Sequence, residues 1–119
     1  MGMDLDGAGG YFRWTATTWD DVLELASEHG WKPMGTGPPK GTHKADWPGY
    51  YFGNDGQLIY AKDGQKLASA LEKALTEMHK NKLPNNIEGT SKEWLYQSEG
   101  RKELRKFLRY CRKGSFRIF

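Results

Sequence analysis

Two side chains that could act as an acid, a base or a metal ligand lie together in a loop rich in glycine and proline. His43 and Asp46 stand three residues apart. A metal site needs three or four ligands, and a catalytic pair needs a third group to orient it. The sequence supplies no such partner at motif spacing. We therefore expect no catalytic residue, no metal and no cofactor, and we expect binding rather than catalysis.

The single cysteine of the chain, Cys111, is a third reactive group. It falls on the apolar side of a predicted helix, where a buried thiol is inert, and no histidine lies near it in sequence to activate it. One cysteine cannot form an internal disulfide. The sequence also shows no apolar leader and no membrane-length run, so a reducing cytoplasm without a membrane partner is the expected location.

Cations form a stripe along the last predicted helix. The tail from residue 99 to 119 holds eight Lys/Arg against two acidic residues, although the whole chain carries a net charge of only +3. The stripe consists of Arg101, Arg105, Lys106, Arg109, Arg112 and Lys113. Three interpretations are open: contact with nucleic-acid phosphates, docking on an acidic protein surface, or a solvated face whose cations favour the negative end of the helix.

Aromatic residues follow the longest irregular segment, residues 32–48, which holds four prolines and three glycines. A loop of this length in a compact domain is usually functional or mobile. Side chains alternate between the two faces of a strand, so one or two rings after the loop are expected to face outward. We predict a protein-binding surface made of Trp47, Tyr50, Tyr51 and His43, because tyrosine and tryptophan are enriched at binding hot spots. Core packing and a small-molecule pocket are the alternatives.

The hydrophobic pattern predicts one α+β domain over residues 1–119. Strand-like composition occurs at residues 11–14, 50–52, 57–60 and 115–119. The second and third of these segments flank Asn54-Asp55-Gly56, a sequence typical of a hairpin turn. We expect a small, mainly antiparallel sheet of about four strands, with three or four helices packed mostly on one face. The Gly-rich first ten residues are expected to be irregular.

Capping residues and hydrophobic periods delimit the helices. Thr18 and Asp21 predict the start of the first helix, and Gly30 predicts its end. Asp63 is expected to cap a long helix whose period is 3.6 residues. The buried face of that helix should comprise Leu67, Leu71, Ala74, Leu75 and Met78.

Two shorter helices follow. A capping box of Thr90 with Glu93 predicts one, and Ser98 is expected to cap the other. The inner face of the last helix should comprise Leu104, Phe107, Leu108 and Cys111.

The chain contains four short motifs, each present once: the MGMD start, the YFRW strand, the NDG turn before a Leu/Ala-rich helix, and the closing GxFRI segment. In this combination the chain resembles a group of small uncharacterised bacterial and phage-associated proteins. The resemblance implies a bacterial or phage source, and it transfers no activity and no functional residue.

These features lead us to expect a small non-enzymatic protein that acts by protein–protein recognition. An immunity or inhibitor protein directed against a toxin or a defence enzyme is one example. The alternative is a nucleic-acid-binding accessory protein that uses the basic C-terminal helix.

Overall fold

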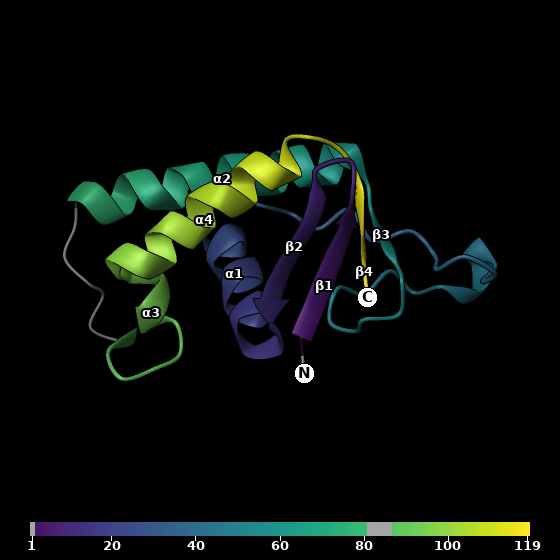
Figure 1. The fold of residues 1–119 in the computed structure, drawn as a ribbon, viewed down its shortest axis with the longest axis horizontal. Helices are drawn as coiled ribbons and strands as arrows, with labels where there is room; N and C mark the ends of the chain where they lie inside the picture. Colours follow the sequence, from purple (N-terminus) through teal and green to yellow (C-terminus); the bar gives the residue numbers. More distant parts are fainter. Residues whose placement is uncertain (1, 81–86) are drawn as a thin grey trace.

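The computed structural model describes residues 2–80 and 87–119. Within them the predicted α+β class is confirmed, with a four-stranded antiparallel sheet and four α-helices (Figure 1). The elements are β1 (Gly2–Gly7), β2 (Gly10–Thr15), α1 (Ala16–Glu28), the 3-10 turn η1 (Lys44–Asp46), β3 (Leu58–Ile59), α2 (Ala61–Lys80), α3 (Glu93–Tyr96), α4 (Ser98–Cys111) and β4 (Phe116–Ile118).

The N-terminal segment is a strand, so the expectation of an irregular start is wrong. The strand order is β2-β1-β4-β3, which places β1 between two antiparallel neighbours. Met3 and Leu5 are buried and alternate with the more exposed Asp4 and Asp6. This is the two-residue period of a half-buried strand. The flanking glycines obscure that period in the sequence.

The predicted hairpin between residues 50–52 and 57–60 is also wrong. Residues 50–52 form no strand, and the two residues of β3 pair instead with β4 at the edge of the sheet. The pairing of Leu58 accounts for the difference. Leu58 exchanges backbone hydrogen bonds with Gly37 and pairs with Arg117 of β4, so residues 50–52 have no free strand edge to join. The buried Gln57 side chain binds the turn before it: its Nε2 donates to the Gly53 carbonyl at 2.5 Å and its Oε1 accepts from the Asp55 N–H at 2.9 Å.

One face of the sheet is apolar and the other is polar. In the β1–β2 register, Met3 lies opposite Trp14 and Leu5 opposite Phe12, while Asp4 lies opposite Arg13. Phe107 of α4 packs on the apolar face, with its ring centroid 5.4 Å from that of Phe12 and 5.5 Å from that of Trp14. The helices therefore cover one face, as the pattern predicted, and the second face meets solvent.

Helix α1 begins three residues earlier than expected. Thr15 is its N-cap, and the Thr15 side chain accepts from the Thr18 N–H at 3.2 Å. The end of the helix is confirmed: Gly30 has a φ of +100°, and the Trp31 N–H returns to the Ala26 carbonyl at 3.0 Å. The positive φ at Gly30 turns the chain so that Trp31 packs back as a buried residue.

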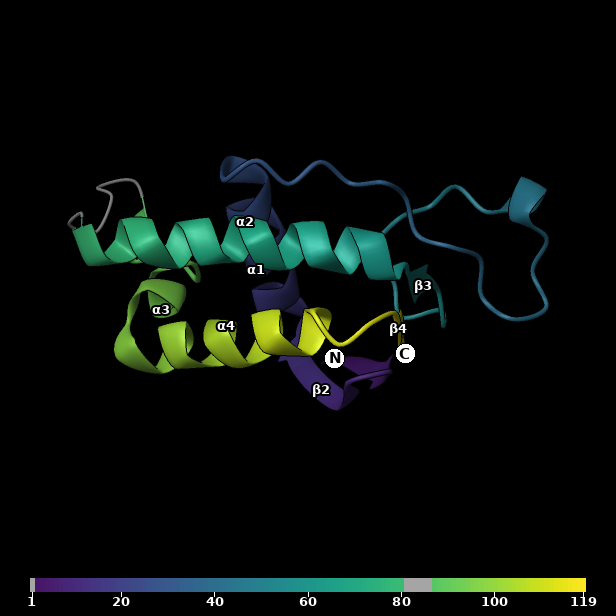
Figure 2. The same cartoon turned by 90° about the horizontal axis from the view of Figure 1, so that it is seen from above.

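Helices α2 and α4 lie side by side over the sheet (Figures 1 and 2). The predicted inner face of α4 is buried in full, and so is that of α2 except for the half-buried Met78. The residues predicted to cap the two C-terminal helices do not cap them. Thr90 precedes α3 without capping it, although Glu93 accepts from the Gly89 N–H at 2.8 Å, and Ser98 is the first residue of α4 after the cap residue Gln97.

Residues 32–57, which we call the arm, extend away from this body. The arm leaves the end of α1, reaches its tip at η1 and returns to β3 (Figure 2). It lies along the longest dimension of the molecule, whose principal extents are 46 × 25 × 23 Å. No helix within the described residues is long and apolar enough to span a membrane.

Candidate functional site

Hydrogen bonds hold the two limbs of the arm together at its base. The Thr36 N–H donates to the Gly49 carbonyl at 3.1 Å, and the Thr36 hydroxyl donates to the Tyr50 carbonyl at 2.8 Å. Gly37 and Leu58 exchange both backbone hydrogen bonds, at 2.7 and 3.0 Å. These hydrogen bonds fix the position of the Gly/Pro loop at its base. Gly37 pairs there with Leu58 of β3, although Gly37 itself lies outside any regular strand.

An aromatic pair stands on this base. The Trp47 Nε1 donates to the carbonyl and the hydroxyl of Thr36, at 3.1 and 3.0 Å. The Trp47 ring lies 4.5 Å from the Tyr50 ring, centroid to centroid, at an angle of 50°. Trp47 is half-buried and Tyr50 is 46% exposed. The pair thus presents a wide apolar surface whose orientation is set by hydrogen bonds.

Tyr51 is a core residue, which corrects its assignment to the binding surface. Only 6% of its surface is exposed. Its hydroxyl donates to Asp63 Oδ2 at 2.5 Å and accepts from the Gly35 N–H at 2.9 Å. Burial raises the pKa of the Tyr51 phenol, and the hydrogen bond to Asp63 raises it further. Tyr51 therefore anchors the arm to α2, and its hydroxyl is engaged within the protein.

Asp63 is the centre of this anchor, and the prediction that it caps α2 is wrong. It lies inside the first turn of α2 and is fully buried. Besides the Tyr51 hydroxyl, it accepts the Trp31 Nε1–H at 3.0 Å, and the Trp31 and Tyr51 rings meet edge to face at 5.2 Å. Two donors and an edge-to-face aromatic contact thus join the end of α1, the arm and α2.

His43 lies at the tip of the arm, immediately before η1, and its side chain is exposed. The Asp46 N–H donates to the His43 backbone carbonyl at 2.9 Å, so the two residues are linked through the backbone. Nowhere in the described residues do three or more His, Cys, Asp or Glu side chains gather closely enough to hold a metal ion.

Several exposed apolar residues on or beside the arm were not among the predicted site residues. Met34 and Phe52 lie within the arm and are 47% and 60% exposed. Tyr60 and Phe119 flank its base, each more than a third exposed: the Tyr60 hydroxyl lies against Gly37, and the Phe119 ring lies against Gly56. Local pattern could not reveal them, because whether a ring faces in or out depends on contacts with distant segments.

A hollow of about 450 Å³ lies where the arm meets α1. Trp31, Pro33, Tyr51 and Phe52 give it an apolar wall, and Asp20 lies among the lining residues from α1. Burial raises the pKa of the Asp20 carboxyl, and the neighbouring Asp21 raises it further. This hollow extends the apolar surface of the arm onto the body of the protein.

The basic stripe on α4 is partly neutralised by its neighbours. Lys106 pairs with Glu103 at 3.1 Å, and Arg112 pairs with Glu72 of α2. Arg105 contacts the His79 Nε2 at 3.1 Å. The remaining members are Arg101, which is half-buried, and Arg109 and Lys113, which are exposed and have no ion pair within the described part of the chain. The stripe is thus a mixed-charge surface along the α2–α4 seam.

Comparison of the chain with protein-family models, with curated proteins and with solved structures found no match.

Proposed function

We propose that this protein acts by binding another protein through its arm, without catalysis. The supporting observation is the projecting aromatic pair of Trp47 and Tyr50, fixed to Thr36 at the base of the arm. Aromatic residues held in place before binding lose little conformational entropy when a partner covers them. Such residues supply most of the energy at protein interfaces.

The neighbouring surface fits the same role. Met34 and Phe52 expose large apolar side chains on the arm, and the hollow against α1 continues this surface. Exposed apolar area that gathers on one projection, rather than scattering singly, is typical of an interaction site. A partner that buried these groups would gain about 25 cal/mol for each Å² removed from water.

The convex shape of the arm suits a concave partner. A projection that ends in a short turn, with His43 at its tip, can enter a cleft such as the active site of an enzyme. We therefore favour an inhibitor or immunity protein that blocks a toxin or a defence enzyme in a bacterial or phage setting. The single buried cysteine fits a cytoplasmic location.

Site-specific photo-cross-linking tests this proposal. A photoreactive residue in place of His43 at the arm tip should give one discrete adduct with a protein in the native host cell. The same residue in place of Lys102, exposed on α4, is the control and should give no such adduct. Adducts of equal yield and size from both positions, or none from position 43, would contradict the proposal.

The alternative, a nucleic-acid-binding accessory protein that uses α4, has less support. Lys106 and Arg112 already pair with carboxylates, and Arg105 contacts His79. The two ion pairs leave fewer charges for phosphate contacts, and each neutralised phosphate adds one increment to binding.

A further inference from the structure

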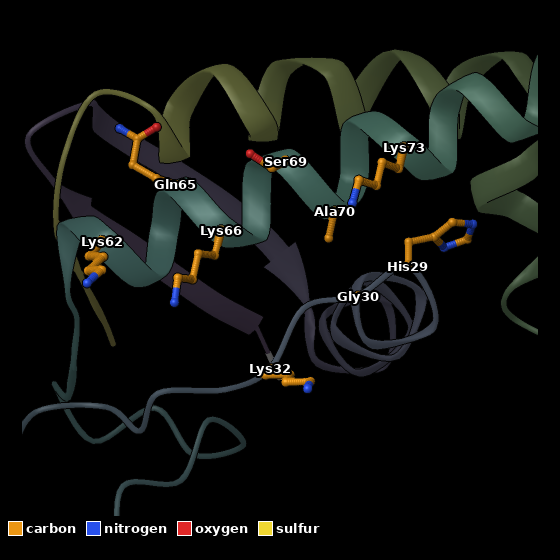
Figure 3. A pocket seen from close by; sticks show the side chains of 9 residues that line it. All are labelled: His29, Gly30, Lys32, Lys62, Gln65, Lys66, Ser69, Ala70 and Lys73. Atoms are coloured by element: carbon orange, nitrogen blue, oxygen red, sulfur yellow. The ribbon is translucent and has the colours of Figure 1, made fainter.

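A second surface besides the α4 stripe is lined by cations. It is a groove of about 410 Å³ between α2 and the turn that follows α1 (Figure 3). One wall is α2, which contributes Lys62, Lys66 and Lys73. The other wall contributes Lys32 and His29. Among the described residues that line the groove, none is acidic.

The four lysines of this groove form no ion pair with another residue of the described ranges 2–80 and 87–119. All four are exposed, and none forms a side-chain hydrogen bond with any described residue. Three acidic residues belong to α2: Asp63 is buried against Tyr51, Glu72 pairs with Arg112, and Glu77 lies with Glu72 and Lys73 around an adjoining hollow. The lining of the groove therefore carries a net positive charge, which favours an anionic ligand.

The spacing of the lysines fits a linear anion better than a compact one. At a rise of about 1.5 Å per residue, Lys62 and Lys66 are about 6 Å apart along α2, and Lys62 and Lys73 about 16 Å apart. Figure 3 shows these side chains spread along the helix instead of converging on one point. Charges repeated along such a line match the repeated phosphates of a nucleic-acid strand.

The lining of the groove also indicates which part of a nucleic acid it would contact. The groove contains no aromatic side chain on which a base could stack, and its floor includes the small residues Gly30 and Ala70. Lysine ammonium groups contact phosphates as point charges and carry no base specificity. Lys32 lies on the wall across from the α2 row, so cations on both walls would bracket a single backbone.

We propose that this groove binds a single-stranded nucleic acid through its phosphates, independently of sequence. This site is separate from the arm and from the α4 stripe, and it stands whether or not the arm binds a protein. Four phosphate contacts on a single strand predict a slope of about −2.8 for log affinity against log salt concentration. Affinity should therefore fall about 50-fold between 50 and 200 mM salt.

Fluorescence anisotropy with the full chain and a labelled single-stranded DNA of mixed sequence tests the proposal. Lys66→Glu combined with Lys73→Glu should abolish measurable binding at 50 mM salt. Arg109→Glu combined with Lys113→Glu makes the same change in net charge on α4, and this control should lower affinity less than about threefold, the range of a remote charge that salt screens. Circular dichroism should show that both variants fold, because all four side chains are exposed.

Three results would overturn the proposal. The first is the absence of binding by the unmodified protein at 50 mM salt. The second is loss of binding in the α4 variant while the groove variant still binds. The third is competition by polyglutamate as effective as that of an oligonucleotide of equal charge, which would identify an acidic protein as the occupant.

Discussion

Asp63 shows how one residue can join three parts of the chain. Its carboxylate accepts from Trp31 at the end of α1 and from Tyr51 on the arm, and it belongs to α2. An aspartate near a helix start is typical of an N-cap, and the sequence pattern predicted that role. The long-range donors, 32 and 12 residues away, are invisible to local pattern.

Replacing Asp63 should therefore destabilise the whole fold. Asp63→Ala leaves the buried Trp31 Nε1–H and Tyr51 hydroxyl without an acceptor, and we expect a loss of about 2–5 kcal/mol in the free energy of unfolding. Asp63→Asn keeps one carbonyl acceptor and should cost less. Urea denaturation followed by tryptophan fluorescence measures both. A loss below about 1 kcal/mol for the alanine variant would show that the anchor contributes little.

One buried thiol and two buried phenols predict how the stability of the fold depends on pH. Burial is the main cause that raises the pKa of the Cys111 thiol and of the Tyr51 and Tyr110 phenols, above ordinary values of 9.0 and 10.0. In the unfolded chain these groups lose protons that the folded protein keeps. The contribution of these protonated groups to the free energy of unfolding is thus complete below about pH 9. It is lost progressively as the pH rises above that value.

Urea midpoints measured from pH 7 to 11 should show this decline. Replacing Tyr51 and Tyr110 by Phe together removes two of the three groups, so the double variant should be less stable at neutral pH and should show a shallower decline above pH 10. An unchanged decline of stability with pH would contradict the raised pKa values of the two phenols.

The Cys111 thiol is fully buried, so in the native protein it should react with thiol reagents only after unfolding.

At the scale of elements, the sequence predicted the helices better than the strands. The inner faces of α2 and α4 follow from a 3.6-residue period sustained over several turns, which local sequence determines. The strand β1 was missed because only Met3 and Leu5 mark its buried side among glycines and aspartates. The hairpin prediction was wrong because Leu58 pairs with Gly37 and with β4, which are distant from it in sequence.

Helix α2 is the element whose packing is most open to a direct test. Leu71 is fully buried in the core, and Leu71→Ala should reduce the free energy of unfolding by about 2–5 kcal/mol through lost apolar contact and a residual cavity. Ser69→Ala, on the exposed side of the same helix, is the matched control and should change stability by less than about 0.5 kcal/mol. Equal effects would mean that α2 does not pack as described.

At the scale of the whole molecule, the protein divides into a packed body and a projecting arm. The sequence predicted an irregular Gly/Pro segment and a binding surface of Trp47, Tyr50, Tyr51 and His43 in and after it, but it could not show that the segment extends outward. That geometry depends on the Thr36 hydrogen bonds at the base and on the buried anchor of Tyr51. The lysine groove was also missed, because Lys32 and the row on α2 meet only in the folded chain.

The division between body and arm predicts that binding and stability respond differently to changes in the arm. Trp47→Ala combined with Tyr50→Ala removes the aromatic pair but leaves the core of the body intact. We expect this variant to lose about 1 kcal/mol or less in the free energy of unfolding.

The most direct test of the proposed function is a calorimetric titration of the cross-linked partner, once purified, with the unmodified protein and with this double variant. Hot-spot residues of this type predict a loss of about 2–4 kcal/mol in binding free energy, or roughly 30-fold to 1000-fold in affinity. Affinity unchanged within about threefold, with the variant folded, would contradict recognition through the arm.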